Sequence, residues 1–141
     1  MPFTLLTKPV AEGRLTSRFG YRRNPTGFRF LAKRHRGIDW AAPAGTPVYA
    51  AGDGTVDKLY VSSTYGNYVR IAHANGFQTA YAHLAAFADG LEEGSAVERG
   101  QQIGSVGRTG SATGNHLHFE LIRAGRQVDP LFDGGWELSG R

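Results

Sequence analysis

Residues 116–121 read HLHFEL, and this alternation of polar and apolar residues decides the fold expected for the chain. Side chains of a β-strand point to opposite faces in turn, so a strand here places His116, His118 and Glu120 on one face. The apolar residues between them can pack into a core. The Cα atoms of the two histidines then lie roughly 7 Å apart, and both imidazoles can point into one groove. Two histidines on a plain solvent face would give the same pattern.

Glycine and proline divide the rest of the chain into short segments. The 141 residues include 20 glycines and 6 prolines, which favours many short strands over long helices. An Asn-Gly pair between residues 68–73 and 77–84 predicts a hairpin of two strands. Residues 48–51 and 55–61 are likewise expected to form two strands joined by a tight turn. Strands are also expected at 101–106 and 116–122, and one short helix at 82–88. We therefore expect a mostly β fold, a single domain over residues 1–141, with a curved antiparallel sheet, a smaller packed sheet and long groove-forming loops.

Composition excludes several classes of protein. Hydrophobic residues make up 40% of the chain, which is typical of a globular protein, and no apolar run reaches the roughly 18 residues that cross a bilayer. Cysteine is absent, so any metal must be held by histidine and carboxylate. The first eight residues lack the features of a signal peptide, which leaves a cytoplasmic protein or a domain whose targeting segment lies elsewhere.

Positive charge is concentrated in the first 40 residues, which carry a net +7 within an overall +4. The loosest stretch, residues 21–36, holds most of these bases. Beside a metal site, such a segment could attract an anionic polymer, whether nucleic acid or a carboxylate-rich cell wall. A solvated basic loop is equally compatible with the composition.

A second pattern, HRGID, runs from His35 to Asp39. Gly37 and the lack of helical periodicity argue against a helix, but in a turn centred on Gly37 the two side chains can converge on one ion. Histidine and carboxylate ligands with an open fourth position are typical of catalytic zinc, which acidifies bound water and polarises a carbonyl. The alternative is a basic loop with an incidental aspartate.

A further histidine, His83, ends the second strand of the predicted hairpin. Regular alternation would place it on the same face as Thr79 and Tyr81. His73 precedes the Asn-Gly turn, and we expect it to be structural.

Taken in order, HxGxD at 35–39, YxH at 81–83 and HxH at 116–118 resemble the lysostaphin/LytM-type zinc endopeptidases, which cleave peptidoglycan peptides. Segments 17–22, 66–69, 73–76 and 100–104 are similar to that family as well. The resemblance therefore covers a family-like core from about residue 15 to residue 130.

The resemblance implies a role for each matched residue. His35, Asp39 and His118 would bind Zn²⁺, the implied cofactor. His116 and His83 would stay off the metal, one as general base on the zinc-bound water and the other hydrogen-bonding the oxyanion, with His116 favoured as the base.

The resemblance also implies a function: a zinc metallo-endopeptidase that hydrolyses peptide cross-links of bacterial peptidoglycan through a metal-activated water, in the periplasm or at the extracellular cell envelope. Its partners would be stem peptides or cross-bridges, with no nucleic acid, and the chain would be a monomeric domain of a longer protein. No segment before Leu15 is long enough to supply the blocking asparagine of some relatives, so an open site is expected. Arginines of residues 21–36 could grip substrate carboxylates. Glu120 would either orient a ligand imidazole or be a plain surface glutamate.

Other readings stay open. Degenerate members of the same family have lost zinc ligands and activate cell-wall amidases as binding modules; this chain keeps every ligand, which favours an enzyme without excluding an activator. A nucleic-acid-binding β-barrel would explain the basic N-terminal third but not the spacing of the histidines. Residues 45–56 and 94–104 are similar to a biotinyl/lipoyl carrier sandwich, yet no lysine stands at a glycine-flanked hairpin tip.

Overall fold

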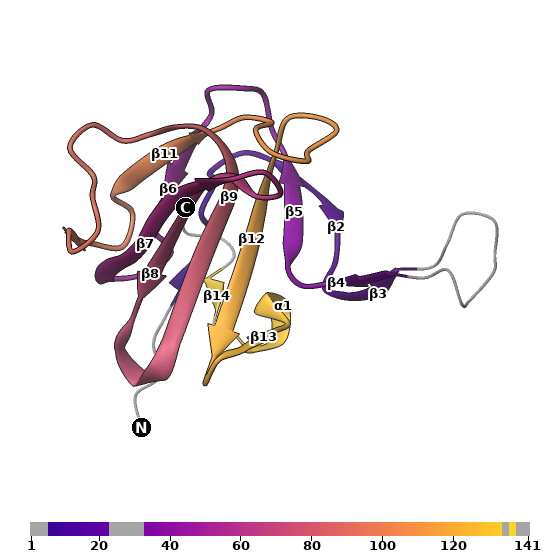
Figure 1. Cartoon of the computed structure of the whole chain (residues 1–141). Helices are drawn as coiled ribbons and strands as arrows, with labels where there is room; N and C mark the ends of the chain where they lie inside the picture. The colour runs from indigo at the N-terminus through magenta and orange to yellow at the C-terminus, as the bar shows by residue number, and fades with distance from the viewer. Residues whose placement is uncertain (1–5, 23–32, 134–135, 138–141) are drawn as a thin grey trace.

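Short β-strands make up most of the computed structural model, which describes residues 6–22, 33–133 and 136–137 (Figure 1). The described strands are β1 (Leu6–Thr7), β2 (Arg14–Ser17), β3 (Gly20–Arg22), β4 (Lys33–His35), β5 (Ile38–Ala41), β6 (Pro47–Tyr49), β7 (Gly54–Ser62), β8 (Gly66–Ala72), β9 (Phe77–Phe87), β10 (Ala96–Val97), β11 (Gln102–Val106), β12 (His116–Arg123), β13 (Arg126–Val128) and β14 (Trp136–Glu137). The helical elements are a 3₁₀ turn, η2 (Ala74–Gly76), and α1 (Pro130–Asp133).

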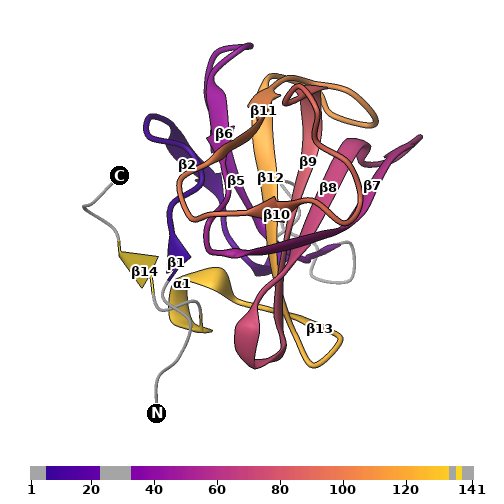
Figure 2. The same ribbon diagram turned by 90° about the vertical axis from the view of Figure 1, so that its left-hand side faces the viewer.

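Most strands join one large antiparallel sheet with the order β10-β7-β8-β9-β12-β5-β2. Strand β11 pairs with β9 and β6, and β13 pairs with β12. Two small sheets accompany it: β1 lies beside β14, as Figure 2 shows, and the β3–β4 hairpin projects to one side in Figure 1. The predicted fold class, mostly β with an antiparallel sheet, is confirmed.

The short helix expected over residues 82–88 is wrong, because strand β9 runs through Phe87. This strand pairs with β8 and β12, and its last part pairs with β11. Ladder hydrogen bonds on both sides outweigh the helix propensity of an alanine-containing segment.

The β8–β9 hairpin forms as predicted, with the Asn-Gly pair inside η2. The strands expected at 48–51 and 55–61 are also present as β6 and β7, but they do not pair with each other. Strand β6 pairs with β11, and β7 pairs with β8. The connection between them therefore carries the chain from one part of the sheet to another and is not a hairpin turn.

The basic stretch at residues 21–36 is not a loop throughout. Its described ends lie in β3 and β4, which pair antiparallel. Residues 23–32 lie outside the described residues, and with them two of the arginines expected to grip a substrate, Arg23 and Arg29.

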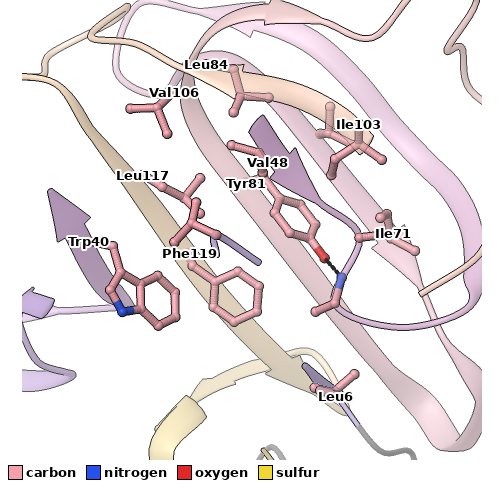
Figure 3. Close-up of a cluster of buried hydrophobic side chains, with 14 of the residues drawn as sticks. Leu6, Trp40, Val48, Ile71, Tyr81, Leu84, Ile103, Val106, Leu117 and Phe119 are labelled. Carbon is pink, nitrogen blue, oxygen red and sulfur yellow. Dashed lines mark hydrogen bonds between the residues drawn. The ribbon is translucent and has the colours of Figure 1, made fainter. Parts of the chain in front are cut away.

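The core lies on one face of the central sheet, where the apolar residues of β12 meet side chains from β5 and β9. Phe119 packs against Trp40 and Tyr81, with ring centroids 5.9 Å and 5.3 Å apart (Figure 3). Leu117 and Leu121 are fully buried on the same face. This packing leaves the polar residues of β12 on the opposite face, as the alternation predicts.

A hydrogen-bonded network crosses this core and ends at His73. The Tyr81 hydroxyl accepts from the Ala51 N–H at 2.9 Å and lies 2.7 Å from the Thr79 hydroxyl. Thr79 lies 2.7 Å from His73 Nε2, and His73 Nδ1 lies 2.7 Å from the Asp53 carbonyl oxygen. One arrangement satisfies every member: Tyr81 donates to Thr79, Thr79 donates to Nε2, and Nδ1–H donates to Asp53. His73 is therefore neutral in this network.

Within the described residues, no helix combines the length and apolar character needed to cross a bilayer.

Candidate metal centre

His35, Asp39 and His118 come together where β4, β5 and β12 meet. Strands β5 and β12 pair so that Asp39 lies directly opposite His118, and His35 ends β4 just before β5 begins. His118 Nδ1 lies 2.8 Å from Asp39 Oδ1, and His35 Nε2 lies 3.3 Å from Asp39 Oδ2. One ligand atom from each residue falls within 4.8 Å of the other two, so the three side chains can hold one metal ion.

Gly37 allows the β4–β5 turn to lie against β12. A Cβ at this position would overlap the carbonyl oxygen of Phe119, which belongs to β12. Only glycine lets the two backbones approach this closely. The glycine between the histidine and the aspartate therefore sets the distance between the turn and His118.

Outer hydrogen bonds direct the correct nitrogen of each histidine toward Asp39. His35 Nδ1 donates to the Arg18 carbonyl at 2.8 Å, which leaves Nε2 facing the carboxylate. His118 Nε2 lies 2.9 Å from Glu120 Oε2, which leaves Nδ1 facing the Asp39 carboxylate. Two imidazoles, each held through its other nitrogen, together with a carboxylate fit the donor set and outer contacts of a zinc site.

The same contacts shift the pKa values of the central pair. Burial alone would raise the pKa of Asp39, but hydrogen bonds from His118 and His35 outweigh it and hold the pKa well below its usual range. Burial alone would lower the pKa of His118, yet Asp39 and Glu120 together raise it to about 9. A metal ion and a proton therefore compete for His118 Nδ1.

His83 and His116 face each other beside the three candidate ligands, with ring centroids 4.9 Å apart. His83 Nδ1 lies 2.7 Å from the Thr109 carbonyl oxygen, and His116 Nδ1 lies 3.0 Å from that of Gly114. Each neutral ring thus carries its proton on Nδ1 and keeps Nε2 free to accept. His116 Nε2 lies 3.9 Å from Asp39 Oδ1, so this nitrogen borders the candidate metal position.

These side chains line one cavity of about 440 Å³. Its wall also includes Tyr65 and residues 111–113. All five residues of the predicted site therefore lie around a single cavity. Burial lowers the pKa of His83, which favours the neutral form of its ring.

His83 reaches the cavity because β9 does not alternate regularly. Thr79 and Tyr81 are fully buried in the core, whereas His83 lines the cavity on the other side. The prediction that His83 shares their face is wrong. His83 has a left-handed backbone with φ of 63°, and the pairing of β9 with both β8 and β11 shifts register nearby. This local kink turns the side chain from the core face to the site.

Glu120 is not a surface residue, since only 1% of it is exposed. Besides His118, its carboxylate accepts hydrogen bonds from the Tyr65 hydroxyl at 2.9 Å and the Gln127 amide at 3.3 Å. The surface alternative for Glu120 is therefore wrong. Strand alternation indicated its face but not its burial.

Tyr65 and Thr109 are site residues that the sequence patterns did not reveal. The Tyr65 carbonyl accepts the His83 N–H at 2.7 Å, and its ring stacks beside His118 at 5.9 Å. Thr109 bonds His83 through its carbonyl and Leu84 through its hydroxyl. Both stand in loops next to glycines, and close glycine spacing was the only sequence signal available.

Comparison with known proteins gives a family match and several relatives. The model of a family described as Peptidase family M23 matches residues 33–130. The chain is 46% identical over 124 residues to the DD-carboxypeptidase/endopeptidase Mpg of Neisseria meningitidis serogroup B, covering 88% of this chain and 28% of that protein. It is 41% identical over 131 residues to the peptidoglycan DD-endopeptidase ShyC of Vibrio cholerae, covering 92% of this chain and 29% of ShyC.

Among solved structures, a zinc-containing peptidase from Vibrio cholerae superposes with a TM-score of 0.82 at 37% identity, covering 96% of this chain and 41% of that one. The chain thus spans less than a third of the length of the two curated relatives described.

Proposed function

Since the chain belongs to peptidase family M23, we propose that it is a zinc-dependent endopeptidase that hydrolyses peptide cross-links of bacterial peptidoglycan. The observation that carries this proposal is the convergence of His35, Asp39 and His118 beside His83 and His116 in one cavity. Relatives named as peptidoglycan endopeptidases support the substrate class. The proposed catalytic domain spans residues 1–141, with a family-like core at about 15–130.

His35, Asp39 and His118 would hold Zn²⁺ through Nε2, a carboxylate oxygen and Nδ1, respectively. The ion would polarise the scissile carbonyl and acidify a water in its open position. Asp39 brings one negative charge to the donor set, so the site keeps a net positive charge toward a developing oxyanion.

His116 and His83 would divide the proton transfer and the oxyanion contact between them. We favour His116 as the general base, because its Nε2 borders the metal position at 3.9 Å from Asp39 Oδ1. His83 would then donate Nε2–H to the oxyanion. Because its Nδ1–H is already held by the Thr109 carbonyl, this contact requires a proton on both ring nitrogens, which the negative charge of the oxyanion would favour. Added imidazole tests this division, because a free base in the cavity should restore some cleavage to His116→Ala but not to His83→Ala.

Digestion of purified peptidoglycan of known cross-link type, with products identified by mass, tests the function. The zinc-loaded protein should release cleaved cross-links, and His116→Ala should abolish release while keeping stoichiometric zinc. Glu98→Ala, at an exposed position after β10, is the matched control and should cleave normally. A protein that takes up no stoichiometric zinc and cleaves no cross-link would rule out the proposal.

The second candidate is a binding module that activates a cell-wall amidase. It gains support if the protein cleaves nothing yet stimulates amidase turnover, and if His116→Ala leaves that stimulation intact. In either case we propose that it works in the periplasm or at the extracellular cell envelope, where peptidoglycan lies, as a monomeric domain of a longer protein.

A further inference from the structure

Glu120 lies at the centre of a buried polar cluster on the side of His118 that faces away from the metal position. Its Oε2 atom lies 2.9 Å from His118 Nε2 and 2.9 Å from the Tyr65 hydroxyl. Its Oε1 atom accepts from the Gln127 amide at 3.3 Å. With 1% of the residue exposed, these contacts replace nearly all the water that a carboxylate would otherwise bind.

The geometry excludes Glu120 as a further ligand of the same ion. The two nitrogens of an imidazole point away from each other, so a group bonded to Nε2 cannot reach an ion on Nδ1. Among the described residues, the group that can hold a metal comprises His35, Asp39 and His118 without Glu120. Glu120 therefore acts on the metal site through the imidazole.

Tyr65 connects this cluster to the rest of the site. Its hydroxyl donates to Glu120, and its ring lies nearly parallel to that of His118, with an interplanar angle of 24°. Its carbonyl accepts the backbone N–H of His83 at 2.7 Å. A shift of Tyr65 would thus disturb both the support of His118 and the position of His83.

We propose that Glu120, Tyr65 and Gln127 form a positioning unit that presents His118 Nδ1 to the metal. Glu120 accepts the Nε2 proton and fixes both the ring orientation and the tautomer. Tyr65 and Gln127 hold the carboxylate in place, one on each oxygen. This inference rests on the proposed function only in taking zinc as the metal, and it concerns metal affinity rather than cleavage.

Zinc affinity, measured by competition with a chelator, tests the unit. Glu120→Ala should weaken zinc binding about 10- to 100-fold, the usual effect of losing an outer hydrogen-bond partner. Glu120→Gln keeps the shape and an acceptor for Nε2 but loses the charge, so its loss should be smaller. Tyr65→Phe keeps the ring beside His118 and removes only the hydroxyl, so it should weaken binding by a few-fold. Glu98→Ala is the matched control and should bind zinc as the unchanged chain does.

Folding and function are separated by two further measurements. If Glu120→Ala does not fold, Glu120→Gln and Tyr65→Phe decide the matter, because both preserve volume. The visible spectrum of bound Co²⁺ reports ligand geometry and should change in Glu120→Gln while thermal unfolding without added metal changes little. Unchanged zinc affinity and an unchanged Co²⁺ spectrum in both variants would overturn the inference. If the variants show the expected changes in zinc affinity and Co²⁺ spectrum but the unchanged chain cleaves no peptide, the proposed function is contradicted and this inference stands.

Discussion

At the scale of single residues, His83 shows how the site departs from regular strand geometry. Its backbone is left-handed at φ 63°, a conformation that costs a non-glycine residue about 1–2 kcal/mol. The Tyr65 carbonyl bonds its N–H, and the Thr109 carbonyl bonds its ring. These contacts hold the strained residue with its imidazole in the cavity. The backbone strain therefore lies at the position where the proposed chemistry needs this imidazole.

This strain predicts an ordering of variants at position 83. His83→Gly should be more stable than His83→Ala by about 1 kcal/mol, because glycine adopts positive φ without the Cβ clash. Both variants should lose peptidase activity, since both lack the imidazole. Urea unfolding monitored by circular dichroism measures the difference, and an alanine variant as stable as the glycine variant would contradict it.

At the scale of elements, two strand connections position the site. The β4–β5 turn brings His35 and Asp39 to β12, and Gly37 lets it lie against the Phe119 carbonyl. The other connection, between the end of β6 and the start of β7, is tied to β8 and β9 through His73. The β4–β5 turn sets the distances between the candidate ligands, and the β6–β7 connection stabilises the sheet that carries His83.

The first connection predicts the effect of one methyl group. Gly37→Ala should destabilise the fold by about 1–3 kcal/mol, the usual cost of overpacking, because the turn must move away from β12. Zinc affinity should fall as well, since the same movement separates Asp39 from His118. Gly114→Ala is the stability control, because a Cβ there meets nothing within 4 Å. Equal unfolding free energies for the two variants would refute the prediction.

The second connection predicts how stability depends on pH. Burial lowers the pKa of His73 below its usual value of 6.5. The unfolded chain then binds a proton more readily than the folded one, so the stability contributed by neutral His73 is complete above pH 6.5 and is lost as the pH falls toward the folded pKa. The unfolding free energy of the unchanged chain should therefore decrease relative to that of His73→Gln between pH 7 and pH 5. A constant difference over this range would show that His73 does not titrate on unfolding.

At the scale of the whole molecule, the candidate metal centre joins parts of the chain that are far apart in sequence. His35 and Asp39 lie near the N-terminal end of the described chain, and His118 lies 79 residues beyond Asp39. A bound ion would therefore link the β4–β5 segment to β12 in the middle of the large sheet. The unfolded chain cannot offer these ligands together.

This separation predicts strong coupling between zinc and folding. Free zinc at 100 times its dissociation constant should raise the unfolding free energy by about 2.7 kcal/mol, and a chelator should remove that gain. Asp39→Asn, which lacks the anionic ligand, should show a much smaller shift. Calorimetric unfolding with zinc and with chelator measures both, and a melting temperature independent of zinc would argue against a specific site.

Much of this organisation can be read from local sequence. The alternation in residues 116–121 predicts β12, the face of its histidines and the apolar face that packs on Trp40 and Tyr81. The Asn-Gly pair predicts the β8–β9 hairpin. Both features can be predicted because the alternation of a strand and the geometry of a tight turn depend only on residues that are neighbours in sequence.

Tertiary structure decides the features that depend on partners distant in sequence. Strands β8, β11 and β12 make residues 82–87 part of a strand where local propensity suggests a helix, and the register shifts beside them turn His83 out of the core. The burial of Glu120 arises from Tyr65, 55 residues away, which no periodicity connects to it. The sequence by itself determined which residues could bind metal and on which face of β12 His118 lies. Only the packing of separate strands, whose pairing energy is non-local, decided how those residues are aimed and held.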